Sequence, residues 1–212
     1  MNTSTYRRVR KITRISSLAF SVVLTLAAAV HAQDRYTIKT ADGVLHVNNS
    51  DSKSFTLEIK GKDIRPQQVD DNIAYGVDGR VVQVVITKIK DVVPAGKSFK
   101  DDEILDLHRK WETDYAAGIY KETLKTTVER EKIENRQISY WYFTRPSHNE
   151  QFDRDFFVST VIGDYILVLS SPLPAGAKIG DYKDYLTTIV KTLKVSDKPF
   201  DIKKLADEIR KS

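Results

Sequence analysis

Gly96, Lys97 and Ser98 are residue types that can bind phosphate, because a P-loop ends in the same three residues. A P-loop also needs a glycine five residues before Gly96. This chain has Asp91 there, and its carboxylate would repel a phosphate. Ser98 followed by Asp101 fits instead the capping box that begins a helix. The sequence therefore predicts a turn and a helix start here, with no nucleotide site.

Histidines and acids are the other residues that could perform acid–base or metal chemistry. Past residue 32 the histidines are His46, His108 and His148, which lie far apart and lack a metal-ligand spacing such as H-E-x-x-H. The sequence contains no G-x-S-x-G elbow that would supply a nucleophilic serine. The acid pairs at 70–71 and 101–102 lack the alternating ligands of a calcium loop and are explained as solvated charges. We expect no catalytic residue, no metal and no cofactor.

The segment 138–148, ISYWYFTRPSH, concentrates aromatic residues beside an arginine. Strand alternation places Trp141 and Arg145 on one face, and His148 follows in a loop. Aromatic rings with an arginine are common in recognition surfaces, so Trp141, Arg145 and His148 are the candidate binding surface. Aromatic residues are also ordinary strand residues, and a core location for these rings is the alternative.

Residues 1–32 have the order of a cleaved secretory signal peptide, with basic residues before an apolar run from Leu18 to Val30. As a helix this run reaches about 20 Å, against a hydrocarbon core of about 30 Å, so it is short for a membrane span. Val30 and Ala32 are small residues at positions −3 and −1 of a cleavage site. The sequence predicts export by the Sec route and cleavage between Ala32 and Gln33. An uncleaved signal anchor is the alternative.

Removal of this leader changes the charge balance. The chain has 34 basic and 29 acidic residues, and five of the basic ones lie in the leader, which leaves 29 of each. The basic character therefore belongs to the leader and gives no support for nucleic-acid binding. The sequence has no cysteine, which excludes a disulfide framework and a lipoprotein anchor. We expect a mature protein without a stable membrane anchor, large enough to form one domain around a core.

The elements that must position these residues are mostly strands. Alternation over 55–60, an apolar stretch over 80–89 and a pair of strands within 155–171 predict a sheet whose central strands are covered on both faces. Spacings of three and four predict two helices, with the buried stripes Ile104, Leu107, Trp111, Tyr115 and Tyr182, Tyr185, Ile189, Leu193. The pattern predicts a single α/β domain over 33–198 and a short helix within 199–212.

A helix, a long hairpin and the segment FFVSTVIGDYILVLSSPLPAGAKIGDYKDYLTTIVKTLKV follow one another in this sequence. Over roughly residues 80–195 this order resembles the PsbP-like fold family, including the DcrB-like bacterial envelope proteins. The resemblance implies an α+β fold in which an antiparallel β-sheet is covered by helices on both faces, an α/β/α sandwich. It also implies use in binding or assembly, with no shared catalytic residues.

Two classes of function are compatible with these patterns. The first is an exported non-enzymatic protein, periplasmic or secreted, which binds a protein partner or a small ligand or assists assembly in the bacterial envelope. The alternative is a secreted hydrolase with an unrecognised carboxylate or serine site. A cleft in which two acids converge would favour the hydrolase.

Overall fold

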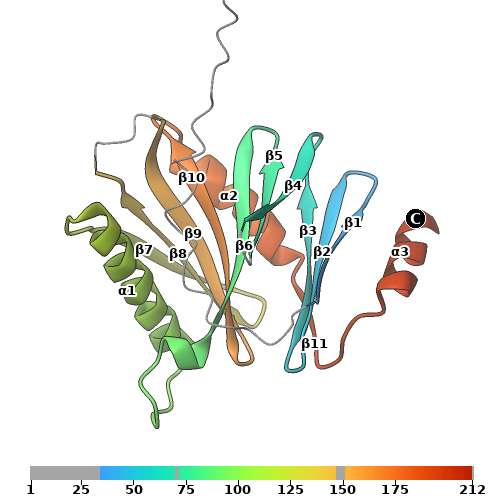
Figure 1. Ribbon diagram of the computed structural model, residues 1–212, viewed down its shortest axis with the longest axis horizontal. Helices are drawn as coiled ribbons and strands as arrows, with labels where there is room; N and C mark the ends of the chain where they lie inside the picture. The colour runs from blue at the N-terminus through green and yellow to red at the C-terminus, as the bar shows by residue number, and fades with distance from the viewer. Residues whose placement is uncertain (1–33, 70–71, 147–150, 212) are drawn as a thin grey trace, which may run out of the picture.

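The computed structural model describes residues 34–69, 72–146 and 151–211 (Figure 1). The leader, with the predicted cleavage site at Ala32 and Gln33, lies outside these residues, as do His148 and the acid pair at 70–71. The strands are β1 (Asp34–Lys39), β2 (Gly43–Asn49), β3 (Ser54–Lys60), β4 (Ile64–Val69), β5 (Asn72–Val77), β6 (Arg80–Lys88), β7 (Thr126–Ile133), β8 (Arg136–Thr144), β9 (Phe152–Ile162), β10 (Tyr165–Pro174) and β11 (Lys194–Ser196). The helices are the one-turn 3₁₀ helix η2 (Ile89–Asp91), α1 (Asp101–Tyr120), α2 (Ile179–Lys191) and α3 (Ile202–Lys211).

A seven-stranded antiparallel sheet is the centre of the molecule, with the strand order β4-β5-β6-β10-β9-β8-β7. The expectation that β6, β9 and β10 lie in the middle is confirmed by this order. The long hairpin β7–β8 forms one edge, where Val128 faces Trp141 in the register. The predicted α+β class with antiparallel pairing is therefore confirmed.

A second sheet has the order β1-β2-β3-β11, and the prediction of one sheet for the whole chain is wrong on this point. β3 pairs with β2 along its length and with the short strand β11, which follows α2 far along the chain. Alternation within a strand indicates which side chains are buried, but it does not indicate which strand is the neighbour. No local pattern in the sequence therefore indicates that the strands divide into two sheets.

Helix α1 packs on one face of the large sheet, over β8 and β9. Ile104, Leu105 and Ala116 join a buried cluster with aromatic residues of the strands, including Trp141 and Phe157.

The buried line of α1 differs from the predicted stripe. Its buried residues are Ile104, Leu105, His108, Glu112 and Ala116. Leu107, Trp111 and Tyr115 are half-buried. Residues three and four apart lie on one side of a helix for either stripe, so the period alone does not fix how the helix is rotated about its axis.

The N-cap of α1, Lys100, lies two residues later than the predicted cap, Ser98. The amide of Lys100 donates to Glu103 Oε2 at 2.8 Å, and Lys100 rather than Ser98 precedes the helix. Gly96 has φ 76°, so the predicted turn is present. The helix continues through Gly118 and ends at Tyr120.

The opposite face of the large sheet meets both α2 and the second sheet. Ile138 and Tyr140 alternate with Trp141 along β8 and lie in a larger buried cluster that includes Leu186 of α2 and Leu57 of β3. Tyr75 of β5 is fully buried in the same cluster. The predicted arrangement, in which helices alone cover the sheet, omitted the four-stranded sheet, which shares the cover of this face with α2.

The short helix expected within 199–212 is present as α3, which lies beyond the second sheet in Figure 1. None of its side chains is fully buried. Asn49 holds the segment before it, because its Nδ2 donates to the Phe200 carbonyl at 2.9 Å and its Oδ1 accepts from the Phe200 amide at 2.8 Å. Among the described residues, no helix is long and apolar enough to cross a membrane.

Asn49→Ala is expected to release α3 without unfolding the sheets. The substitution removes both hydrogen bonds to Phe200, each with a net contribution of about 1 kcal/mol. Faster hydrogen exchange and faster tryptic cleavage confined to residues 198–211, followed by mass spectrometry, would show this release. Lys198→Ala, an exposed change in the same segment, is the matched control. Unchanged protection of α3 in Asn49→Ala would contradict the anchoring role.

Candidate functional site

Trp141, the first residue of the candidate binding surface, lies in the core. Its side chain is 1% exposed. It stacks on Phe157 at 3.8 Å between ring centroids, and its Nε1 donates to Ser159 Oγ at 3.3 Å. The core alternative therefore describes this ring, and the prediction of Trp141 as a contact residue is corrected. Trp141 is buried because it lies on β8 under α1, and alternation alone does not indicate which face a helix covers.

Arg145, the second candidate, is engaged inside the protein. Its Nε and Nη2 donate to Asp155 Oδ2 and Oδ1 at 2.7 and 2.6 Å, and its guanidinium lies over the Phe152 ring. Both side chains are about 95% buried. Burial raises the pKa of Asp155, and the hydrogen bonds and charge of Arg145 oppose this rise. Trp141 and Arg145 thus form no exposed surface, and the prediction for His148 is not tested because it lies outside the described residues.

His46 lies between the two sheets. Its Nδ1 is 2.9 Å from the Tyr75 hydroxyl, which is also 2.9 Å from Thr37 Oγ1. Burial, with the charge of Arg35, lowers the pKa of His46 to about 3, and burial raises that of Tyr75 to about 12. Both side chains are thus neutral near pH 7, which suits a role in holding the sheets together.

His108 belongs to a different layer, under α1, where its Nε2 is 3.5 Å from Glu112 Oε1. Its ring is fully buried. Within 34–69, 72–146 and 151–211, no three His, Asp or Glu side chains form a group that could hold a metal ion. His46 and His108 are thus both buried and lie in different layers, so they share no open site.

A pocket of about 490 Å³ lies where β6 runs into η2, beside the β9–β10 turn. Its lining residues are Lys88, Ile89, Lys90, Val93, Asp164 and Tyr165. Pairing of β6 with β10 sets Lys88 opposite Tyr165, and the Ile89 amide donates to the Asp164 carbonyl at 2.9 Å. The volume is in the range typical of small-ligand sites.

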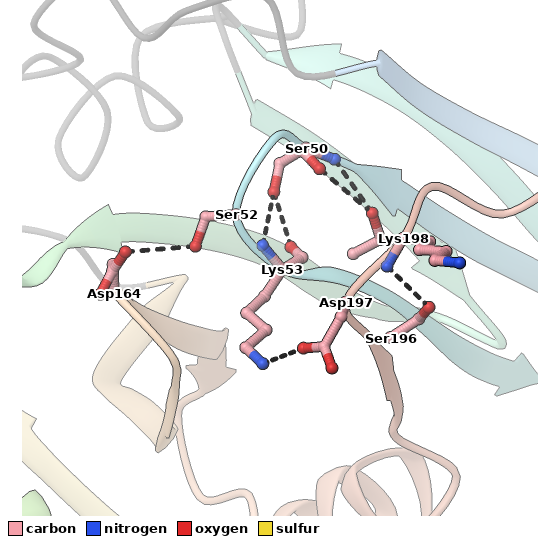
Figure 2. Close-up of polar contacts among 8 residues, drawn as sticks. Ser50, Ser52, Lys53, Asp164, Ser196, Asp197 and Lys198 are labelled. Carbon is pink, nitrogen blue, oxygen red and sulfur yellow. Dashed lines mark hydrogen bonds and ion pairs between the residues drawn. The ribbon is translucent and has the colours of Figure 1, made fainter.

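The β9–β10 turn, which contributes Asp164 and Tyr165 to this pocket, contacts the loop between β2 and β3 of the second sheet. Figure 2 shows the polar contacts around this loop. Ser52 Oγ donates to Asp164 Oδ2 at 3.2 Å. Lys53 forms an ion pair with Asp197. Its aliphatic stem lies against Gly163, where an added Cβ would come within 2.6 Å of Lys53 Cγ. Gly163 also has φ 56°, so the close approach and the backbone both require a glycine.

Among the residues that the structure describes, the cations of the pocket have no acidic partner. Lys88 is half-buried and Lys90 is exposed. In the described part of the chain neither ammonium takes part in an ion pair or a hydrogen bond. Only some of the other described lysines are paired with acids, namely Lys53, Lys60, Lys110, Lys183 and Lys204.

Reasoning from the sequence missed this pocket. The sequence predicts a pair of strands within 155–171, but the contact of their turn with Lys88 depends on the pairing of β6 with β10. Two lysines at the end of an apolar strand, in ITKIKD, are the signal that the sequence offers.

Comparison with known proteins gives matches among solved structures alone. No family model matches the sequence, and no curated protein is similar to it. The solution structure of cyanobacterial PsbP from Synechocystis sp. PCC 6803 matches with 10% identity and a TM-score of 0.43, over 80% of this chain and 96% of that chain. It belongs to the family that the sequence resembles, whereas the DcrB-like part of that resemblance stays a prediction. At this identity and TM-score, we transfer no ligand, partner or activity from it.

Proposed function

We propose that this chain is a non-catalytic binding protein whose ligand occupies the pocket between η2 and the β9–β10 turn. The observation that carries this proposal is the pocket itself. It has an apolar wall formed by Ile89 and Val93, and two lysines that have no acidic partner within the described parts of the chain. A ligand site needs a concave apolar wall and a few polar groups that fix orientation, and this pocket has both.

The residues of the pocket support binding better than catalysis. Asp164 is the one acid among its lining residues, and its Oδ2 already accepts a hydrogen bond from Ser52. The hydrolase alternative needs a second acid, or a base beside a nucleophile, within reach of the same substrate. His108 and Glu112 lie under α1, where no pocket-lining residue is found.

The proposal includes export by the Sec route, and a place in the periplasm or outside the cell. The basic residues before the apolar run from Leu18 to Val30, and the small residues at Val30 and Ala32, support it. A protein that binds a small ligand or a partner there would act as an accessory of the bacterial envelope.

Nuclear magnetic resonance with the isotope-labelled protein, expressed from its full sequence, tests the binding function. We expect members of a small-molecule library to shift amide resonances of residues 88–93 and 163–165 in a concentration-dependent way. Lys90→Trp, which places an indole at the pocket wall, should weaken binding at least about tenfold through lost volume. Lys125→Trp, in the exposed residue before β7, is the control. Ligands that shift only resonances elsewhere, or none at all, would refute the site.

A further inference from the structure

Lys88 and Lys90, which pair with no acid in the described segments, give the pocket a preference for negatively charged ligands. Asp164 balances one of them at most, so the lining carries a net positive charge. Lys88 is a partly buried residue at the end of a strand whose pairing with β10 fixes its backbone. An anionic group of the ligand would restore the missing partner.

The other residues that line the pocket can contact an apolar part of a ligand. Ile89 and Val93 provide aliphatic surface, and the ring of Tyr165 provides an aromatic one. The amide of Val93 donates to the Ile89 carbonyl at 2.9 Å, so the turn that carries both residues is closed by its own hydrogen bond. A wall held in place in this way loses little entropy when a ligand binds.

Asp164 sets a limit on the ligand. Its carboxylate is held by Ser52 at the wall, and it would repel a second negative charge placed near it. A polyanion such as a phosphate ester would place several charged oxygens in the same volume. A ligand with a single negative charge avoids this repulsion and can still contact Lys88 and Lys90.

We propose that the ligand of this pocket is a monocarboxylic acid with an aromatic or aliphatic body. Its carboxylate lies between Lys88 and Lys90, and its apolar body lies against Ile89, Val93 and Tyr165. The inference rests on the proposed binding function. The same chemistry is offered by a free organic acid and by the C-terminal residue of a peptide.

Three ligands of matched size test the charge preference: phenylacetate, phenylacetamide and 2-phenylethylamine. Titration of the labelled protein, read from the resonances of residues 88–93 and 163–165, gives each affinity. We expect phenylacetate to bind at least about tenfold more tightly than the amide, because charge-assisted hydrogen bonds are roughly twice as strong as neutral ones. The amine should bind most weakly. Equal affinities, or tighter binding of the amine, would overturn the ligand class while leaving the binding function intact.

Variants and a peptide complete the experiment. Lys88→Gln and Lys90→Gln should each lose the preference for phenylacetate over phenylacetamide, whereas Lys125→Gln should keep it. Lys90 is exposed, so this variant remains informative if Lys88→Gln fails to fold. A peptide ending in phenylalanine, compared with its C-terminal amide, separates the two sources. If the free-acid peptide binds more tightly than phenylacetate, the ligand is the C-terminus of a peptide. If phenylacetate binds more tightly, the ligand is a free organic acid. No binding by phenylacetate or by the free-acid peptide would refute the proposal.

Discussion

Arg145→Ala is expected to lower the free energy of unfolding by roughly 3–5 kcal/mol, the largest effect of any single substitution proposed for this protein. The physical reason is the carboxylate that remains. Asp155 is almost fully buried, and its two oxygens accept the hydrogen bonds of Arg145 at 2.7 and 2.6 Å. Without the guanidinium this charge has no compensating partner. Urea unfolding followed by circular dichroism measures the change.

Two further variants separate charge from lost packing. Arg145→Met combined with Asp155→Leu removes both charges and keeps much of the volume, so it should recover most of the lost stability. Arg136→Ala removes a more exposed arginine, 3.3 Å from Glu134, and should change stability by about 1 kcal/mol or less. A loss for Arg145→Ala no larger than that for Arg136→Ala would contradict the importance of the buried pair.

The second large effect is a loss of stability in acid that originates at His46. Its pKa is about 3 in the folded protein, compared with about 6.5 in an unfolded chain. Between these two pH values the unfolded state binds a proton that the folded state excludes, so stability falls as the pH drops below 6.5. At pH 5 this group alone should remove about 2 kcal/mol relative to pH 8.

His46→Gln isolates this contribution, because glutamine does not titrate and offers an oxygen to the Tyr75 hydroxyl. Acidic residues also change stability with pH, so the measured quantity is the difference in slope between the two proteins from pH 8 to pH 5. We expect the variant to be less stable at pH 8 and to have a shallower slope. Parallel slopes would show that His46 takes up its proton without opening the contact between the sheets.

The aromatic strand β8 illustrates which features the sequence predicts correctly and which it does not. Alternation correctly separated Trp141 from Tyr140, and the structure places them in different buried clusters. The choice between surface and core depended on whether a helix lies above Trp141. The position of α1 is fixed by packing across the sheet, and no pattern within 138–148 contains that information.

Sequence by itself determined the local features: the absence of cysteine, the strands of the central sheet and the presence of helices near 101–120 and 179–191. These follow from hydrophobic period, turn residues and composition, which act over a few neighbouring residues. Only the tertiary structure decided that the strands form two sheets, which side of α1 is buried, and that Lys88 and Lys90 lie beside Asp164 and Tyr165. Those arrangements depend on pairing between segments far apart in the chain, and the free energy of such pairing is not encoded in any one of them.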